Sequence, residues 1–351
     1  MINFNFYPYT DGQIKQRHNS KMLYNTYVEA LQNYNLKFLY KMVWQKHQQG
    51  YQLLAKVNMR TQKRDYLGRR SEKTEKIASD FLNSKKTAKE RVKHLKEKLV
   101  KNAKLNKIEG IARTPKELVR LFRKINELGL DSKLIVIGTN SLYAYEARAG
   151  VAIEEEHLAT EDIDILNRRD KGLSFIFKEM LSPTKALDFL HLIDKSFYQH
   201  EKIPYRFINK DGVWVELINP ISDSISSFVM KNHLFIDMLP LDMKGIQWLE
   251  NSRLFKETII ATNGESANIT TIHPLEYAIY KNWLSKRENR DFQKHRRDKQ
   301  QSRLVTKLIL EYMPNIEIAD ELKELKHLKR EVVEEYVSEI FTKVVEENSD
   351  R

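Results

Sequence analysis

The sequence predicts an α+β fold in which a mixed sheet forms a core between a basic helical region and a helical domain. Two observations support this prediction. Apolar residues recur at spacings of three and four before residue 110 and after residue 273, as they do along helices. Short stretches rich in β-branched residues, separated by turn-forming residues, occupy the interval between them. We therefore expect an N-terminal helical and hairpin region over 1–110, a core over 111–272 and a C-terminal helical domain over 273–351.

The N-terminal region is predicted to contain two helices with a small hairpin between them. One helix covers about residues 20–48, where tyrosine and apolar residues share one face, and the other covers Glu72–Lys107. The hairpin covers about residues 50–68. Half of the chain's 16 tyrosines lie before residue 70. Their helical spacing favours a packed stripe, and stacking on nucleic acid bases is the alternative.

The chain carries 60 basic and 48 acidic side chains, a net charge of +12. Either general solubility or a polyanionic partner, with nucleic acid as the first candidate, explains an excess of this size. Residues 81–110 hold ten Lys or Arg against three Glu, and residues 281–303 hold nine against three acids. We expect a basic helix in each range. Each is either a solvated helix face or a surface that docks on phosphates.

The core is expected to open with a helix shortly after Gly110. Its start is signalled by Thr114 as N-cap, Pro115 in the first turn and Glu117 at the capping-box position. Gly129 supplies the residue type that commonly ends a helix. The elements expected after it are, in order, a strand at Lys133–Ile137, a helix at Asn140–Ala149, a strand at 160–166, a helix from Ser182 to Ser196, hairpins at 205–218 and 258–272, and helices from Pro274 onward.

Two aspartates on one strand are the most informative feature of the core. Asp162 and Asp164 are two residues apart, so both side chains leave the same face of the strand, about 7 Å apart along the backbone. Carboxylates placed side by side repel each other unless a cation lies between them, which indicates a divalent metal. Glu216 is the only acid in the apolar strand Val213–Ile218. Three such acids would hold two Mg²⁺ (or Mn²⁺) ions about 3.5–4 Å apart, together with substrate phosphates.

The turn before the aspartate strand suggests a phosphate site. Gly138 lets the backbone come close to a phosphate, and Thr139 offers a hydroxyl. Asn140 begins a helix whose free N–H groups attract anions. Each feature is common by itself, and their order along the chain adds weight. The predicted ligand is a nucleoside triphosphate (NTP).

Other features narrow the class of protein. The chain has no cysteine, which excludes disulfides, zinc–thiolate sites and thiol catalysis. Neither a signal peptide nor an apolar run of about 20 residues is present, so a soluble, cytoplasmic protein without a membrane partner is expected. His157 follows three glutamates, where we expect either a metal site or, preferably, a solvated loop.

Taken together, the Gly-Thr turn, the Asp-x-Asp strand and the later strand acid resemble the polymerase-β-like nucleotidyltransferase superfamily. The long gap from Gly138 to Asp162 is similar to that of the abortive-infection type toxins. One uncharacterised bacterial family is similar over most of the chain. The resemblance to it lies in Tyr66-Leu-Gly68, in Gly138-Thr-Asn-Ser-Leu-Tyr-Ala-Tyr145, and in the series Pro274, Lys281, Ser285, Arg287, Asp298 and Gln301.

The resemblance implies a role for each matching position. Asp162 and Asp164 would bind metal, and Glu216 would bind the catalytic metal and help to deprotonate the attacking hydroxyl. The nucleotide would be held by Gly138, Thr139, Asn140, Lys281 and Arg287. This chain departs from the superfamily pattern in having Thr139 in the turn and Glu, which is longer than the usual Asp, as third acid.

The function expected from the resemblance is that of a nucleotidyltransferase of the EC 2.7.7 type. It would move a nucleoside monophosphate (NMP) from an NTP to a hydroxyl of a macromolecule and release pyrophosphate. The charge pattern makes RNA, bound through the basic helices 81–110 and 281–303, the first candidate acceptor, and a protein side chain the second. One alternative is a catalytically inactive nucleic-acid-binding protein on the same fold. Another is a nucleotidyltransferase acting on small molecules.

Overall fold

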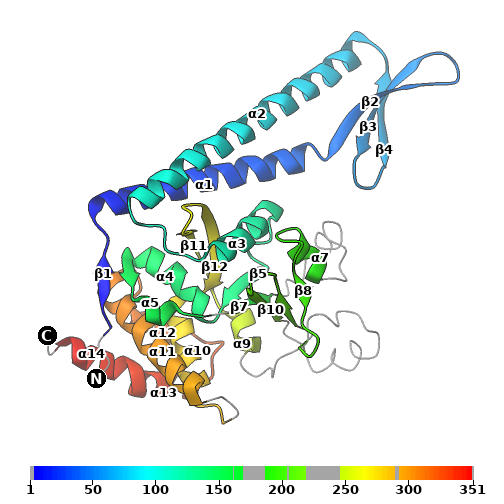
Figure 1. Cartoon of the computed structure of the whole chain (residues 1–351). Coiled ribbons are helices and arrows are strands. Elements are labelled where there is room, and N and C mark those ends of the chain that lie inside the picture. The colour runs from blue at the N-terminus through cyan, green and yellow to red at the C-terminus, as the bar shows by residue number, and fades with distance from the viewer. Residues whose placement is uncertain are drawn as a thin grey trace.

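The computed structural model describes residues 4–160, 162–168, 186–203, 205–218, 246–288 and 292–349. The chain folds as a mixture of helices and sheets, as predicted from the sequence. A long helical arm crosses one side of a body that contains the central sheet and the C-terminal helices (Figure 1). Across the described ranges, no helix combines the length and the apolar character that crossing a membrane requires.

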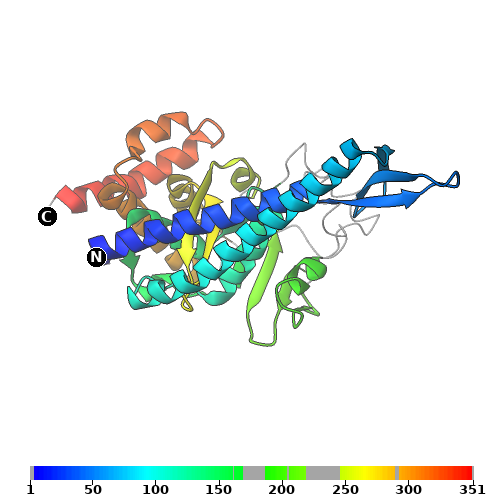
Figure 2. The same ribbon diagram turned by 90° about the horizontal axis from the view of Figure 1, so that it is seen from above.

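The arm consists of two antiparallel helices, α1 (Asp11–Lys37) and α2 (Glu72–Ile108). They lie side by side in both views, and a three-stranded sheet caps their far end (Figures 1 and 2). This sheet has the order β2-β3-β4 and contains the strands β2 (Tyr40–Lys46), β3 (Gln52–Asn58) and β4 (Arg64–Arg69). The predicted second helix and hairpin are confirmed.

The prediction of one helix over residues 20–48 is wrong, because α1 ends at Lys37 and residues 40–46 form a strand. Apolar residues in this stretch fit the helical period and also alternate along a strand. Seven residues of β2 pair with β3, from Tyr40 opposite Asn58 to Lys46 opposite Gln52. Tertiary pairing of this kind overrides a local periodicity that allows both structures.

A polar seam fixes the two arm helices against each other. The Nε2 atom of Gln16 donates to Oδ1 of Asn106 over 2.8 Å, and the hydroxyl of Ser20 donates to the same oxygen and to Oδ1 of Asn102. All four side chains are buried. Buried polar groups that satisfy one another in this way define one register between two helices.

The base of the arm is also joined to the body. Lys21 lies 2.6 Å from Glu257 on the hairpin that β11 (Leu254–Ile260) forms with β12 (Ser266–Ile272). In the turn of that hairpin, the backbone of Gly264 accepts from Asn106. A Cβ atom on Gly264 would lie 1.9 Å from the carbonyl oxygen of Ala103, so only glycine allows this approach. The arm is therefore held in a defined direction.

The central sheet has five strands in the order β5-β7-β10-β9-β8. Its strands are β5 (Leu134–Ile137), β7 (Asp162–Asn167), β10 (Trp214–Ile218), β9 (Arg206–Ile208) and β8 (Tyr198–Gln199). Strand β7 pairs antiparallel with β5 and parallel with β10, whereas the β10–β9 and β9–β8 pairs are antiparallel. The predicted hairpin over 205–218 is confirmed as β9 and β10.

The helix α3 (Lys116–Leu128) packs its apolar face into the core, where Leu118, Val119 and Phe122 are fully buried. Gly129 ends it in the left-handed conformation, with φ of 69°, as predicted. The prediction of Thr114 as N-cap is wrong. Pro115 occupies that position without a side-chain hydrogen bond, and Thr114 forms a β-bridge with Ala261 instead.

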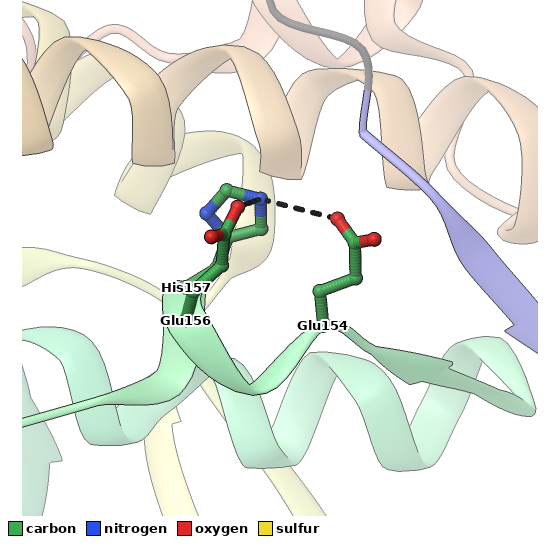
Figure 3. A group of neighbouring side chains, drawn as sticks. All are labelled: Glu154, Glu156 and His157. Carbon is green, nitrogen blue, oxygen red and sulfur yellow. Dashed lines mark ion pairs between the residues drawn. The ribbon is translucent and has the colours of Figure 1, made fainter.

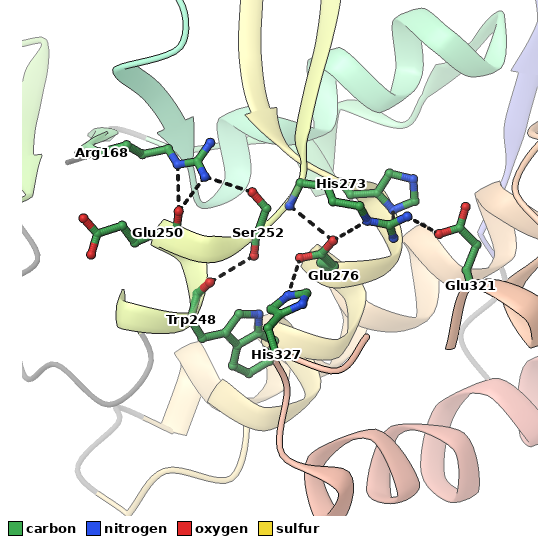
Figure 4. A network of polar contacts seen from close by, with 9 residues as sticks. Arg168, Trp248, Glu250, Ser252, His273, Glu276, Glu321 and His327 are labelled. Carbon is green, nitrogen blue, oxygen red and sulfur yellow. Dashed lines mark hydrogen bonds and ion pairs between the residues drawn. The ribbon is translucent and has the colours of Figure 1, made fainter. Parts of the chain in front are cut away.

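Helix α10 (Pro274–Leu284) packs against C-terminal helices that follow it in the chain. A network of polar contacts ties them to the β11–β12 hairpin through Glu276 (Figure 4). Its carboxylate accepts from Arg253 over 2.8 Å and contacts His327 over 3.0 Å, and Arg253 also pairs with Glu321. Burial and the nearby Arg253 lower the pKa of His273 to about 4, so this histidine is neutral at physiological pH.

The prediction of one basic helix over 281–303 is wrong. Helix α10 ends at Leu284, Ser285 to Glu288 are not helical, and α11 spans Phe292–Tyr312.

The start of the helix predicted from Ser182 lies outside the described residues, and its described part, α7 (Ala186–His191), ends five residues before Ser196. The remaining elements are β1 (Phe6–Pro8), a 3-10 turn at Thr139–Ser141, α4 (Leu142–Ala149), β6 (Val151–Ile153), α5 (Glu155–Leu158), α9 (Ile246–Asn251), α12 (Ile318–Glu324), α13 (Arg330–Tyr336), a π-helical turn at Val337–Phe341 and α14 (Thr342–Ser349).

Candidate active site

An open pocket of about 260 Å³ lies between the central sheet and the helices α10 and α11. Its lining combines three acids with four basic side chains. The acids are Asp162, Asp164 and Glu216, and the basic residues are Arg206, Lys281, Lys294 and Arg297. Gly138 and Thr139 complete one side of it. Most of the site residues expected from the sequence therefore lie around one cavity.

The register of the sheet brings the three acids together. Strand β10 runs parallel to β7 with Glu216 paired to Asp164, so the two side chains leave the same face of the sheet at the same level. Asp162 lies two residues before Asp164 on that face. The alternate residues Ile163 and Val215 are buried on the opposite face. This alternation separates a carboxylate face from an apolar face.

The ionised form of Asp164 is disfavoured by its surroundings in the cluster. Burial, together with the negative charges of Asp162 and Glu216, raises the pKa of its carboxyl from 3.8 to about 7. Lys281 and Lys294 act in the opposite direction. A divalent cation among the three acids would reverse this effect, since it favours the ionised carboxylates. The donor set, with oxygen ligands alone, suits Mg²⁺ or Mn²⁺.

Gly138 lies against this cluster. Its φ is 72°, in the region that favours glycine, and a Cβ atom there would lie 2.5 Å from Oδ2 of Asp164. The missing side chain is thus what permits the backbone turn to meet the carboxylate. The turn places its backbone and the Thr139 side chain at the edge of the acidic cluster, as the sequence suggested for a phosphate site.

The next two residues of the turn have side-chain partners. The hydroxyl of Thr139 accepts a hydrogen bond of 3.0 Å from Gln301 on α11, and Gln301 in turn accepts one from Tyr277 on α10. Asn140 donates to the carbonyl oxygen of Asp162 over 2.7 Å, which joins the turn to the start of β7. Asn140 therefore positions the aspartate strand, and its side chain is already engaged.

Arg206 is a pocket residue that we did not predict from the sequence. Its Nε atom lies 2.7 Å from Oε1 of Glu216, which is opposite it in the β9–β10 hairpin. Its guanidinium also stacks on Trp214, 4.4 Å from the ring centroid. The third acid is therefore matched by a basic side chain on the adjacent strand.

Lys281 is buried, and its Nζ atom lies 2.7 Å from Oδ1 of Asp298, which is also buried. This pair joins α10 to α11 beside the acidic cluster, and both residues belong to the sequence series that carried the family resemblance. Arg297 lines the same pocket, and its Nε atom is buried without a hydrogen-bond partner among the residues that the structure describes. An oxygen-rich ligand would satisfy such a donor.

Arg287 lies outside the lining of this pocket. Its guanidinium stacks on Trp283, 4.6 Å from the ring centroid, in the non-helical stretch after α10. Arg287 therefore lies apart from the other expected nucleotide-binding residues, since α10 ends before it, and its nucleotide contact stays a prediction. Lys294 at the start of α11 lines the pocket instead.

A second acidic cluster lies on α5 (Figure 3). The Nε2 atom of His157 is 3.7 Å from Glu154 and 3.6 Å from Glu156. The preferred expectation of a solvated loop is wrong for His157, which is 11% exposed and packs edge-on against Phe4. Glu154 also accepts from Asn5 over 2.9 Å. The ligand atoms of the three side chains lie within 4.8 Å of one another, and Nε2 of His157 is buried without a hydrogen-bond partner among the described residues, so the group could hold a metal ion.

Comparison with known protein families decides the class of this chain. A family model described as a nucleotidyltransferase matches residues 116–326. The chain belongs to this nucleotidyltransferase family. The match contains every residue of the pocket described above, and it confirms the prediction of a transferase of nucleotidyl groups. No curated protein and no solved structure matches the chain.

Proposed function

We propose that this nucleotidyltransferase moves an NMP from an NTP to a hydroxyl group of RNA and releases pyrophosphate. In this proposal the core is of the polymerase-β-like type and the reaction is of the EC 2.7.7 type. The observation that carries the proposal is the convergence of Asp162, Asp164 and Glu216 on one face of the sheet, opposite basic side chains. A carboxylate cluster and a cationic wall suit metal-bound triphosphate.

The three acids fit a pair of divalent ions, because they present only oxygen ligands and because the charges of Asp162 and Glu216 oppose the ionisation of Asp164. When bound, Mg²⁺ or Mn²⁺ would neutralise phosphate charge and lower the pKa of the attacking hydroxyl. Asp162 and Asp164 would hold the ions. Glu216 would be the third ligand and would draw the proton from the hydroxyl.

The remaining pocket residues would bind and orient the triphosphate. The Gly138 turn allows the phosphates to approach the backbone, and the Thr139 hydroxyl, held by Gln301, offers a polar contact. Attack of the acceptor oxygen on the α-phosphorus forms one P–O bond and breaks the bond to the bridging oxygen of the β-phosphate. Lys281, Lys294 and Arg297 line the same pocket and would stabilise the charge that develops on pyrophosphate.

A second open pocket, of about 440 Å³, supports a separate place for the acceptor. Asp162 lines both pockets, and Trp214 and Asn140 line the second one. A hydroxyl that enters from this side would meet the α-phosphate next to the aspartates. Trp214 is partly exposed there and offers a ring on which a terminal nucleoside can stack.

The test is incubation of the protein with labelled NTPs, Mg²⁺ or Mn²⁺, and total RNA or total protein. Label should pass to RNA with the native chain and should be lost with Asp162→Ala and Glu216→Ala. Asp211→Ala, an exposed acid in the β9–β10 turn, is the matched control and should retain transfer. The proposal would be contradicted if the folded native protein left RNA unlabelled with every NTP and with both metals.

Thermal unfolding separates this proposal from the inactive nucleic-acid-binding alternative. NTP with Mg²⁺ should raise the melting temperature of the native chain and leave that of Asp162→Ala unchanged, because ligands stabilise only the state that binds them. The alternative expects salt-dependent RNA binding and no effect of NTP on either protein.

A further inference from the structure

The sheet at the end of the arm carries exposed side chains on the outer strands of one face. In the central strand, Val57 pairs with Lys41 on one side and with Arg64 on the other, and Ala55 pairs with Val43 and with Tyr66 in the same way. These side chains therefore lie on one face of the sheet. Arg64 and Tyr66 both donate to Oε1 of Gln45, which places these side chains on the same side. We call this surface the arm-tip face and define it as Lys41, Val43, Gln45, Arg64, Tyr66 and Arg69.

The central strand is buried on both faces of the sheet, through Leu54 on one face and Ala55 and Val57 on the arm-tip face. The outer strands of the arm-tip face carry exposed side chains: Tyr66 is 53% exposed, and Lys41, Arg64 and Arg69 are exposed. The arm-tip face thus presents one aromatic ring and three basic side chains to a partner.

The charge of the arm end is strongly one-sided. Residues 39–71 contain eight Lys or Arg and a single acid, Asp65. Helix α2 continues this character toward the body with exposed lysines such as Lys85, Lys86 and Lys89. A surface of this charge is complementary to a polyanion.

The side chains of the arm-tip face favour nucleic acid over a membrane. Its exposed apolar groups are Val43 and Tyr66, and the adjoining turn and bulge add Met59 and Leu67, a small apolar area beside eight basic side chains in residues 39–71. The exposed ring of Tyr66 shares this face with Lys41, Arg64 and Arg69, whose guanidinium lies 4.0 Å from the ring centroid of Tyr51. This combination suits unpaired nucleotides, in which a base stacks on a ring and cations contact the phosphates.

We propose that the arm-tip face binds an unpaired loop of a folded RNA whose hydroxyl end lies in the active site. This inference rests on the proposed function for the choice of RNA. Helix α2, with 37 residues, is about 55 Å long, and the sheet lies at its end away from the body (Figures 1 and 2). The acceptor would therefore be a large structured RNA, which the arm selects by its distant contact.

The experiment measures binding of a fluorescein-labelled RNA hairpin with an unpaired loop to the full-length protein over a range of salt concentrations. Tyr66→Ala should weaken binding about fivefold or more, and Tyr66→Phe, which keeps the ring, should bind as the native chain does. Lys41→Gln with Arg69→Gln should lower the slope of log affinity against log salt by about two. The matched control, Lys323→Gln with Arg330→Gln, removes two exposed charges from the C-terminal helices and should leave the slope unchanged.

The inference would be overturned if Tyr66→Ala bound the RNA hairpin with native affinity and Lys41→Gln/Arg69→Gln kept the native dependence of affinity on salt. Equal binding of the matching DNA hairpin, or binding to phosphatidylglycerol vesicles that is lost with Tyr66→Ala, would overturn it as well. NTP with Mg²⁺ should raise the melting temperature of every arm variant as much as that of the native chain. If the arm variants lose RNA binding but NTP with Mg²⁺ does not stabilise the native chain, this inference stands and the proposed function is rejected.

Discussion

Replacing Asp164 by Asn is expected to stabilise the metal-free protein at pH 8 while abolishing nucleotidyl transfer. The carboxyl of Asp164 has a pKa of about 7 in the folded chain against 3.8 for the ordinary group, because burial and the charges of Asp162 and Glu216 oppose its ionisation. Each factor of ten in acid dissociation is worth about 1.36 kcal/mol, so ionised Asp164 costs the fold about 4 kcal/mol.

Solvent in the open pocket screens part of this repulsion, and we expect a gain of about 2–4 kcal/mol from the neutral amide. The gain depends on pH in a defined direction. Below about pH 4 the carboxyl is protonated in both the folded and the unfolded chain, so its penalty is absent. Between pH 4 and pH 7 the unfolded chain releases the proton and the folded chain keeps it, so the penalty grows, and above pH 7 it is constant.

Urea unfolding in the presence of EDTA at pH 5 and pH 8 measures this difference. The free energy of unfolding of Asp164→Asn should be higher than that of the native chain at pH 8. The difference between the two proteins should be smaller at pH 5. Asp194→Asn is a control of opposite sign, because hydrogen bonds from Ser196 lower the pKa of Asp194 and are weakened by the amide. An Asp164→Asn protein that is no more stable than the native chain at pH 8 would refute the electrostatic reasoning.

Three further outcomes are expected. The stabilisation by NTP with Mg²⁺, measured by thermal unfolding, should be larger at pH 8 than at pH 6, because metal binding must displace the proton that Asp164 holds. Gly138→Ala should lower the free energy of unfolding by about 1–3 kcal/mol and reduce label transfer at least tenfold, since its Cβ would collide with Asp164. Lys281→Met should lower the free energy of unfolding, measured in urea, by about 3–5 kcal/mol by removing the cation that faces buried Asp298, and adding Asp298→Leu should restore much of the loss.

Local patterns were sufficient to predict the central acids. Alternation along a strand places Asp162 and Asp164 on one face and requires no knowledge of the fold. The parallel register that sets Glu216 beside Asp164 is a property of the sheet, and the sequence carries no local signal for it. The structure brings the third acid to the pocket as the resemblance implied, and its role stays a proposal.

Arg206 shows why a predicted hairpin does not fix its register. Counting outward from the predicted turn at residues 209–212 sets Arg206 opposite Val215, whereas the observed pairing of Ile208 with Trp214 sets it opposite Glu216. The break at Ser285 was harder to predict, because charged residues at helical spacing continue through it. The arm could not be predicted as a projecting unit, since its direction depends on long-range contacts such as that of Gly264 with Ala103.

The polar seam of Gln16, Ser20, Asn102 and Asn106 has a consequence for how this protein can change in length. Because hydrogen bonds fix the two helices at their base, they cannot slide along each other. The length of the arm is therefore set by the number of helical residues beyond these hydrogen bonds. Adding one turn to both helices would carry the tip outward by about 5.4 Å and preserve its orientation. Adding a turn to only one helix would tilt the tip, so insertions in the two helices should occur in matched pairs.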